Sequence, residues 1–294
     1  MRSAVLAKTK EVEEIIYPYF DFEGEIIEGL RKPMEYSVKA GGKRLRPMLM
    51  REAALLYSDE PKTLPLFMAA MEMIHTYSLV HDDLPDMDND ELRHGKMSTH
   101  KKFGSAMGIL CGDALLNYAY ELIFRALSAD RDAAVIKAGQ ILASSSGALG
   151  MVGGQSLDVL SEKADMDLNE EDILYIYRNK TGKLISAALK IGGTLAHGSE
   201  QDIISFDHIG TNIGFAFQIQ DDILDIEGSE ATLGKPIGSD ISNNKRTYVD
   251  KFGMDKSKAM VKELTKEALD ILSDLPGDSS FLSDLFNYLT EREV

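Results

Sequence analysis

Apolar residues recur at helical spacing along almost the whole chain, and no stretch alternates between apolar and polar residues as a half-buried strand would. The predicted helices span residues 3–17, 23–39, 44–56, 62–82, 107–128, 132–147, 149–160, 169–191, 200–224, 255–273 and 278–291. There is no fixed repeat and no low-complexity linker. The sequence therefore predicts an all-α fold in one large domain over residues 1–294.

Several helix boundaries and two long loops have local signals. Gly41-Gly42 ends one predicted helix, and Asn169 followed by Asp172 predicts an N-cap with an acidic third position at the start of another. Residues 84–100 and 226–247 lack an apolar period and are rich in Gly, Asp, Asn and Lys. Loops of that length in a compact domain are usually functional, so we expect the chemistry there.

One uncharged segment, residues 138–157, is about as long as a bilayer span. It holds many glycines and serines, so its apolar content is low for lipid, and we interpret it as a helix through the protein interior. The first residues of the chain contain too short an apolar stretch for a signal peptide. We therefore expect no membrane span.

Composition narrows the possible partners. Hydrophobic residues make up 44% and charged residues 27% of the chain, which is a globular balance. The net charge of −16 argues against a nucleic acid or an anionic membrane surface as partner. Cys111 is the single cysteine, which excludes an internal disulfide and a zinc site built from cysteines, and indicates a reducing, cytoplasmic location.

The first of two aspartate clusters covers residues 82–88, where the first long loop begins. On a continuing helix, Asp82 would share a face with Asp86. Pro85 disfavours helical geometry at the residue before it, so that pairing cannot be assumed. Periodicity therefore leaves the partner of Asp82 open between Asp86 and Asp88.

The second aspartate cluster ends the predicted helix 200–224 with Asp221, Asp222 and Asp225. Asp221 and Asp225 lie about 40° apart around a helix, so their carboxylates share one face. Like charges this close favour protonation unless a cation intervenes. Either cluster alone is also typical of a solvated helix end, whereas two in one helical protein indicate a hard-oxygen site for Mg²⁺ and substrate phosphates.

A basic turn at residues 41–47 precedes the first cluster. Arginine binds phosphate as a bidentate fork and lysine as a point charge, so Lys43, Arg44 and Arg46 suit a phosphate ligand. A solvated basic patch has the same composition. His75 lies on the helix face of the first cluster, where a lone histidine is often only hydrogen-bonded. Further cations in or near the loops are Arg93, Lys180, Lys235 and Lys245.

At these residues the chain resembles the trans-isoprenyl diphosphate synthases, most closely the short-chain bacterial farnesyl diphosphate synthases. The resemblance runs motif by motif from Gly41 to Tyr248. The matching motifs are Gly-Gly-Lys-Arg-Leu-Arg-Pro at 41–47, Ile-His-Thr-Tyr-Ser-Leu-Val-His-Asp-Asp-Leu-Pro at 74–85, Gly-Asp-Ala-Leu-Leu at 112–116, Gly-Gly-Gln-Ser-Leu-Asp at 153–158, Lys180-Thr181, Phe-Gln-Ile-Gln-Asp-Asp-Ile-Leu-Asp at 217–225 and Gly-Lys-Pro at 234–236. One aspartate motif is weak evidence, but two in this order behind the basic turn are very specific.

The resemblance implies an all-α bundle around a central cavity, a homodimer, and two or three bound Mg²⁺ ions. The implied metal-binding residues are Asp82, Asp83, Asp88, Asp221, Asp222 and Asp225, with Asp82 and Asp88 as the ligands of the first cluster. Those implied for isopentenyl diphosphate are Lys43, Arg46, His75 and His94. Those implied for the allylic diphosphate are Arg93, Lys180, Thr181, Gln218 and Lys235. The implied catalytic set is Asp82, Asp88, Arg93, Lys180, Thr181, Gln218 and Asp221.

The implied reaction is a Mg²⁺-assisted ionisation, condensation and elimination, in which isopentenyl diphosphate condenses with dimethylallyl or geranyl diphosphate to give farnesyl diphosphate and diphosphate. No side chain is an obvious dedicated base. Product length should depend on the depth of the cavity, and Tyr77 and Ser78, about one turn before Asp82, resemble the floor that limits it in farnesyl producers. Ordinary core packing is the other interpretation of Tyr77.

The chain departs from the family pattern at His94, where a second arginine usually follows Arg93, and at Met97, where proline is usual. A neutral histidine binds phosphate less well than arginine does, so we expect weaker or pH-dependent binding of isopentenyl diphosphate.

Other functions have weaker support in the sequence. A geranyl or geranylgeranyl diphosphate synthase has the same motifs. A helical metal-dependent phosphohydrolase would account for His81-Asp82 but leaves the second cluster and the basic turn unexplained. A non-catalytic subunit would fit the change at His94, although the intact aspartate clusters argue against lost activity.

Overall fold

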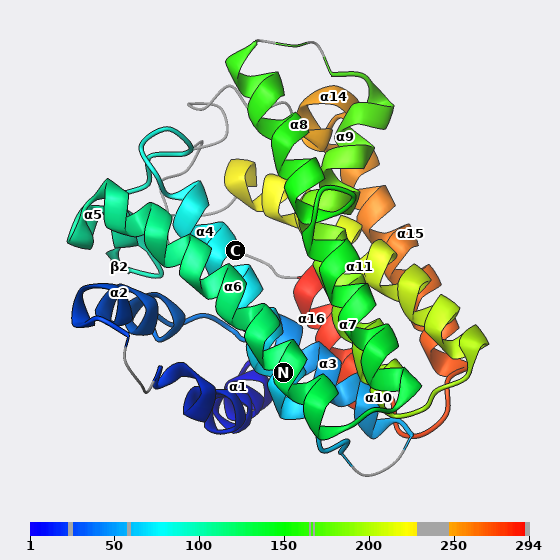
Figure 1. The fold of residues 1–294 in the computed structure, drawn as a ribbon. Coiled ribbons are helices and arrows are strands. Elements are labelled where there is room, and N and C mark those ends of the chain that lie inside the picture. The colour runs from blue at the N-terminus through cyan, green and yellow to red at the C-terminus, as the bar shows by residue number, and fades with distance from the viewer. Residues whose placement is uncertain (23–25, 58–59, 165, 167, 228–246, 292–294) are drawn as a thin grey trace. The chain divides into compact units, whose positions relative to one another are not determined.

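A computed structural model describes residues 1–22, 26–57, 60–164, 166, 168–227 and 247–291 (Figure 1). It confirms the predicted all-α class, and within those residues the only strands are two of two residues each. The chain forms two compact units. The N-terminal unit comprises Ser3–Arg51 and Pro61–Ile136, and the C-terminal unit comprises Met1–Arg2, Glu52–Glu60 and Lys137–Val294. The single domain predicted over residues 1–294 stays a prediction.

The N-terminal unit is built around two long helices. Its elements are α1 (Arg2–Ile16), the 3₁₀ turn η1 (Tyr17–Phe20), α2 (Glu28–Val38), α3 (Leu45–Leu55), α4 (Leu64–Asp82), β1 (Leu92–Arg93), β2 (Lys96–Met97), α5 (Thr99–Phe103) and α6 (Ser105–Ala129). Helix α4 is apolar on most of its circumference and runs alongside α6, with α2 and α5 packed against α6 (Figure 1). A helix that is hydrophobic all round belongs in a core, which is where α4 lies.

A short hairpin interrupts the first predicted loop, 84–100. Leu92 pairs with Met97 and Arg93 with Lys96, and the turn between them is His94-Gly95. Both turn residues have positive φ, 51° and 74°, as the tightest antiparallel hairpins require. The predicted loop therefore contains a hairpin that was not predicted, because His-Gly is a less familiar turn signal than Asn-Gly.

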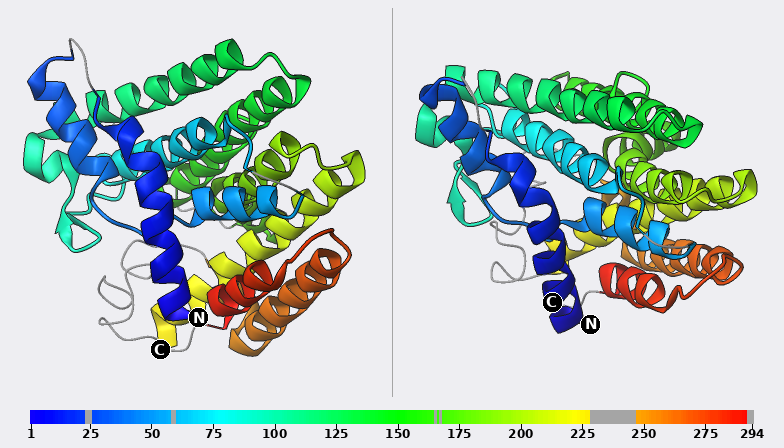
Figure 2. Two further views of the ribbon diagram at one scale, coloured as in Figure 1. Left: turned by 90° about the horizontal axis from the view of Figure 1, so that it is seen from below. Right: turned by 60° about the horizontal axis from the view of Figure 1, so that its bottom comes forward.

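The C-terminal unit packs α10, α15 and α16 around one long helix, α11. Its elements are α7 (Ala133–Ser146), α8 (Met151–Lys163), α9 (Glu170–Ile176), the π-helical segment η2 (Tyr177–Gly182), α10 (Lys183–Leu195), α11 (Glu200–Glu227), α14 (Tyr248–Phe252), α15 (Met254–Ser273) and α16 (Ser280–Thr290). Figure 2 shows α15 (orange) and α16 (red) side by side. Asn169 and Asp172 form the predicted cap at the start of α9. Each side chain accepts a hydrogen bond from the backbone N–H of the other residue, so the cap is a complete capping box.

Two element predictions in the C-terminal unit were wrong. Residues 138–157 form no single interior helix: α7 ends at Ser146, α8 begins at Met151, and between them Leu149 is 85% exposed. The helix predicted over 169–191 is divided by the wider turn of η2. Among the described helices, none has the length and apolar character needed to span a membrane.

Candidate functional site

The basic turn adopts backbone angles that exclude most side chains. Gly41 and Gly42 both have φ of +118°, a region that glycine enters without steric cost. Arg44 follows at φ +49°, and the Thr9 hydroxyl of α1 donates to the Lys43 carbonyl at 3.1 Å. The turn is therefore fixed in an unusual conformation, with the Lys43 side chain exposed.

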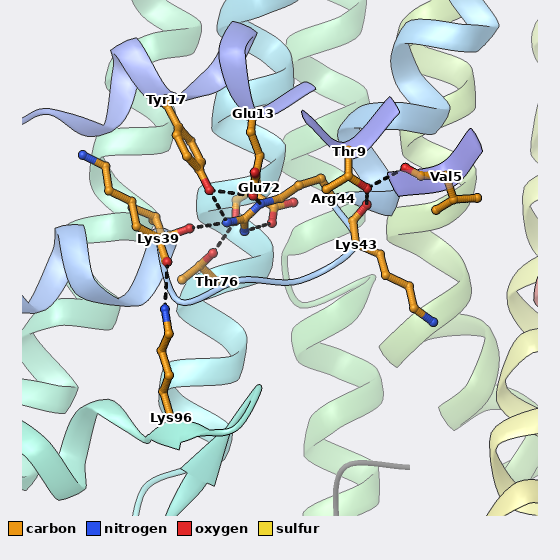
Figure 3. A network of polar contacts seen from close by, with 11 residues as sticks. Val5, Thr9, Glu13, Tyr17, Lys39, Lys43, Arg44, Glu72, Thr76 and Lys96 are labelled. Atoms are coloured by element: carbon orange, nitrogen blue, oxygen red, sulfur yellow. Dashed lines mark hydrogen bonds and ion pairs between the residues drawn. The ribbon is translucent and has the colours of Figure 1, made fainter. Parts of the chain in front are cut away.

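Arg44 points into the protein instead of toward solvent (Figure 3). Its guanidinium donates to Glu13 at 3.1 Å, to Glu72 at 2.7 Å, to the Tyr17 hydroxyl at 3.2 Å and to the Val38 carbonyl at 2.8 Å. Burial lowers the pKa of Arg44, but the neighbouring Glu72 carboxylate and Tyr17 hydroxyl together outweigh this effect, so the pKa is raised. This cation is thus neutralised by the protein itself.

Arg46 and His75 lie in a different environment from Arg44. The Nε of Arg46 is buried and has no hydrogen-bond partner within the described part of the chain. Desolvation lowers the pKa of Arg46 to about 10, so it remains charged at neutral pH. Desolvation, with the positive charge of Arg46, lowers the pKa of His75 well below its ordinary value, which leaves His75 neutral.

The first aspartate cluster folds back on itself directly after α4. The backbone N–H of Asp88 donates to the Asp82 carbonyl at 2.9 Å, and that of Met87 donates to the Leu84 carbonyl at 2.9 Å. Asp86 lies on the exposed outside of this turn. The backbone therefore brings Asp88 next to Asp82, the alternative that helical periodicity could not decide.

Arg93 on β1 is held beside this cluster by Asp83. Its Nε donates to the Asp83 carboxylate at 3.0 Å, its Nη2 donates to the same carboxylate, and Asp90 accepts a further bond at 3.2 Å. Burial raises the pKa of Asp83 despite the arginine, and the Asp83 carboxylate in turn raises the pKa of Arg93 against the effect of burial. In this structure Asp83 engages the arginine predicted to bind diphosphate.

His94 lies against the basic turn. Its Nε2 is 3.5 Å from where a Cβ on Gly42 would stand, so the ring covers the glycine backbone. Partial desolvation lowers the pKa of His94, and the neighbouring cations Arg93, Arg44, Lys96 and Lys43 lower it further. His94 is therefore a neutral residue in a group of cations.

The two residues predicted to limit product length lie on α4. Tyr77 is 6% exposed, and its ring meets the His81 ring edge-on at 5.8 Å between centroids. The Ser78 hydroxyl donates to the His75 carbonyl at 2.9 Å. A buried tyrosine suits both interpretations given above, so the assignment of Tyr77 as a floor stays a prediction.

In the C-terminal unit, the second aspartate cluster ends α11 and bonds to η2. Asp222 and Asp225 are buried, and Asp221 is half-buried. The Tyr177 hydroxyl donates to Asp222 at 2.5 Å and accepts from the backbone N–H of Tyr248 at 3.0 Å. One hydroxyl thus joins the cluster to the first residue of α14.

Segment η2 also carries Lys180 and Thr181. Lys180 pairs with Asp158 of α8 at 2.5 Å, and the Thr181 hydroxyl donates to the Gln218 side chain at 3.0 Å. Isolated π-helical turns inside α-helices are frequent at functional sites, because the extra residue redirects side chains. Here the segment brings two predicted ligands within reach of α8 and α11.

The sequence analysis did not identify Tyr177, which bonds to Asp222, or Asp158, which pairs with Lys180. Asp158 ends the matched motif at 153–158, so that motif was an available signal, whereas Tyr177 had none.

Lys235 lies outside the described residues. Among the residues that are described, no three His, Cys, Asp or Glu side chains gather into a metal cluster. The metal ligands and the sharing of ions between the two aspartate clusters stay predictions.

Comparison with known proteins identifies the family. Residues 27–275 match the family model described as polyprenyl synthetase. The farnesyl diphosphate synthase of Micrococcus luteus is 43% identical over 265 residues, which are 90% of this chain and 89% of that protein. The chain belongs to the polyprenyl synthetase family.

Other members of the family differ in the product for which they are named. Geranylgeranyl pyrophosphate synthase 4 of Arabidopsis thaliana is 40% identical over 90% of this chain and 71% of that protein. A solved structure of the Helicobacter pylori geranyltransferase, complexed with magnesium and isoprenyl diphosphate, superposes with a TM-score of 0.80 at 28% identity, covering 97% of this chain and 96% of that one. These likenesses extend over nearly the whole chain.

Proposed function

We propose that this protein is a prenyltransferase that condenses isopentenyl diphosphate with dimethylallyl or geranyl diphosphate to give farnesyl diphosphate and diphosphate. The observation that carries the proposal is the turn after α4, where Asp82 and Asp88 are neighbours and Asp83 holds Arg93 beside them. Paired carboxylates next to a fixed arginine suit a magnesium–diphosphate ligand. The resemblance to farnesyl diphosphate synthases supports the same conclusion.

Two sets of side chains would hold the two diphosphates. Lys43 and Arg46 would bind isopentenyl diphosphate, with His75 and His94 as neutral hydrogen-bonding groups. Support comes from Arg46, whose buried Nε has no hydrogen-bond partner among the residues that the structure describes and whose charge is retained at neutral pH. The allylic diphosphate would be bound by Arg93, Lys180, Thr181, Gln218 and Lys235.

Magnesium ions, two or three in number, would be held by Asp82 and Asp88 and by Asp221, Asp222 and Asp225. Carboxylate oxygens are the ligands that Mg²⁺ prefers, and its remaining positions go to water and substrate phosphate. When bound, Mg²⁺ would stabilise the negative charge of the leaving diphosphate. Asp83, predicted in the same set, would contribute by orienting Arg93, because its carboxylate accepts two bonds from that side chain.

The reaction needs charge stabilisation more than acid–base catalysis. Breaking the allylic carbon–oxygen bond places negative charge on the diphosphate, which Arg93 and Lys180 would stabilise. The positive allyl group would lie near the oxygens of Thr181 and Gln218, which bond to each other. The double bond of isopentenyl diphosphate attacks the allyl group, and the proton lost afterwards passes to the released diphosphate.

A product assay tests this function. Purified protein is incubated with isopentenyl diphosphate, Mg²⁺ and each allylic starter in turn, and the dephosphorylated products are sized by chromatography. We expect a fifteen-carbon alcohol as the main product. A twenty- or ten-carbon product would make the protein a geranylgeranyl or geranyl diphosphate synthase. Phosphate release without prenyl transfer would indicate a phosphohydrolase, and no turnover would indicate a non-catalytic subunit.

We also propose that the protein is a cytoplasmic homodimer. The family resemblance supports a dimer, and α6 carries large apolar side chains at its surface, with Leu110 52% and Phe124 67% exposed. Light scattering after size exclusion should give a mass near 65 kDa, twice the chain mass of 32.5 kDa. A mass equal to that of one chain would contradict the dimer.

A further inference from the structure

The cations of the basic turn lie in different environments, and the position of Glu72 accounts for the difference between Arg44 and Arg46. Arg44 makes its ion pair with Glu72, whose side chain is 4% exposed. Glu72 also raises the pKa of Arg46 against the larger lowering effect of desolvation, so the two groups lie close enough to interact. Yet in the described part of the chain the second carboxylate oxygen of Glu72 and the Nε of Arg46 each lack a hydrogen-bond partner.

Glu72 is therefore a potential competitor for Arg46. A buried guanidinium and a buried carboxylate that both have unused hydrogen-bonding capacity attract each other strongly, because each is costly to leave unpaired. Arg44 prevents that pairing, because its Nη1 donates to Glu72 at 2.7 Å. The Nε of Arg44 donates to Glu13 at 3.1 Å, which fixes the guanidinium in place. The positive charge of Arg46 then remains available for an anionic ligand.

Arg44 also fixes the backbone that carries Lys43. Its own φ of +49° is unusual for a residue with a side chain, and such angles persist only where the surroundings hold them. The surroundings here are four acceptors from α1, η1, α2 and α4. In Figure 3 the Lys43 side chain runs away from the Arg44 guanidinium, on the other side of the turn.

We propose that Arg44 is a positioning residue for isopentenyl diphosphate. It does not bind the ligand; it neutralises Glu72 and holds the turn, so that Arg46 and Lys43 bind the diphosphate. This inference rests on the proposed function, because it assigns a role within the isopentenyl diphosphate site. The sequence analysis placed all three cations of the turn together, whereas the structure separates Arg44, which is neutralised by Glu13 and Glu72, from Arg46, whose Nε has no hydrogen-bond partner among the described residues.

The test is a double-mutant cycle over Arg44 and Glu72. Arg44→Gln releases Glu72 to pair with Arg46, so KM for isopentenyl diphosphate should rise about tenfold or more, while kcat and the allylic KM stay within about twofold. Adding Glu72→Gln removes the competing carboxylate, and the double variant should return to within about threefold of the original KM. Glu72→Gln alone should leave KM unchanged or lower it.

Two further variants separate positioning from general stability. Arg51 pairs with Glu11 at 3.0 Å and joins α3 to α1, so Arg51→Gln breaks another, more exposed arginine–glutamate ion pair of the same helices. It should leave both KM values unchanged. Arg44→Lys keeps a positive charge beside Glu72 and should raise KM for isopentenyl diphosphate less than Arg44→Gln does. Arg44→Lys also serves as the test if Arg44→Gln does not fold. In that case, a KM for isopentenyl diphosphate in Arg44→Lys as high as the KM in Arg46→Gln would overturn the proposal.

Three results would contradict the inference. Arg44→Gln could leave KM for isopentenyl diphosphate unchanged, it could raise both KM values and lower kcat together, or the double variant could bind as poorly as the single one. Each of these leaves the proposed function intact if the unmodified protein still makes a prenyl product. Absence of prenyl transfer by the unmodified protein would instead defeat the proposed function.

Discussion

At the scale of single residues, the Tyr177 hydroxyl bonds directly to the second aspartate cluster. Tyr177→Phe keeps the ring in its core but removes the donor to Asp222 and the acceptor for the Tyr248 N–H. We expect the Mg²⁺ concentration for half-maximal activity to rise about fivefold, and the free energy of unfolding to fall by about 1–3 kcal/mol. Activity titrated with Mg²⁺ and urea unfolding measure the two effects.

Tyr248→Phe is the matched control for that experiment. The Tyr248 ring is fully buried, and its hydroxyl has no hydrogen-bond partner among the described residues. Removing a buried hydroxyl that makes no bond should cost little stability and leave the Mg²⁺ dependence as it was. If both variants shifted the Mg²⁺ dependence alike, the Tyr177 hydroxyl would have no special link to Asp222.

If His94 belongs to the isopentenyl diphosphate site as proposed, binding of that substrate should depend on pH. Its pKa is lowered by desolvation and neighbouring cations, so it is neutral above its ordinary value of about 6.5 and gains charge only at lower pH. An anionic ligand binds better to the protonated form of His94, because that form carries a positive charge. His94→Arg supplies a permanent charge and should lower KM for isopentenyl diphosphate about threefold to tenfold at pH 8.

The ratio of the two KM values tests the sign of this effect. Dividing the KM of the unmodified protein by that of His94→Arg cancels the titration of the substrate itself. The ratio should be largest at pH 8 and decrease toward 1 as the pH falls and His94 becomes protonated. A ratio that stays constant with pH would show that His94 does not titrate at this site.

Tyr77 is the residue predicted to limit the length of the product. It is 6% exposed on α4, five positions before Asp82. If it limits the space for the growing chain, Tyr77→Ala should shift the main product from fifteen to twenty or more carbons, as sized by chromatography. An unchanged product distribution with a less stable protein would assign Tyr77 to ordinary core packing, where such a truncation costs about 3–5 kcal/mol.

At the scale of secondary-structure elements, helix α8 approaches η2 at Gly154. A Cβ on Gly154 would stand 2.3 Å from the Lys180 nitrogen and 2.9 Å from the Asn179 carbonyl carbon, both backbone atoms. Gly154→Ala must therefore push α8 away from η2 and disturb Lys180. We expect a loss of about 1–3 kcal/mol in the free energy of unfolding and a lower kcat.

Gly29→Ala is the matched control for this substitution. Gly29 lies on α2, where an added Cβ would meet nothing within 4 Å, so the same change should stabilise the protein by about 0.5–1 kcal/mol. Urea unfolding of both variants checks the pair. Equal stability of Gly154→Ala and the unmodified protein would contradict the close approach of α8 and η2.

The helices were predictable from the sequence because their apolar faces repeat at helical spacing, as in α4 and α11. The exceptions depend on interactions that periodicity does not record. The π-helical segment η2 follows from packing against α8, the turn of β1–β2 depends on positive φ at His94, and α14 is only five residues long. Short elements are decided by caps and neighbours, not by an apolar face.

The residue types of the candidate site could be read from the sequence, but the contacts among them could not. The backbone turn that brings Asp88 next to Asp82 is one such contact. The difference between Arg44 and Arg46 depends on Glu72, 28 positions away from Arg44, and Tyr177 bonds to Asp222 across 45 positions. Contacts over such separations leave no local pattern in the sequence.

At the scale of the whole molecule, the protein combines a net charge of −16 with cations that are held by individual acidic side chains. In the N-terminal unit Arg93 is held at Asp83 and Arg44 at Glu72. In the C-terminal unit, Lys180 is held at Asp158. The central claim of the proposed function is that each of the two aspartate clusters is needed for Mg²⁺-dependent binding of the allylic diphosphate.

Calorimetric titration with an unreactive thiolo analogue of the allylic diphosphate, in the presence of Mg²⁺, tests this claim most directly. The proteins compared are the unmodified chain, Asp82→Asn in the N-terminal unit and Asp221→Asn in the C-terminal unit. If both clusters serve one ligand, either substitution alone should weaken Mg²⁺-dependent binding about tenfold or more. Full affinity in one of the two variants would mean that its cluster takes no part in binding the allylic diphosphate, which would contradict the account.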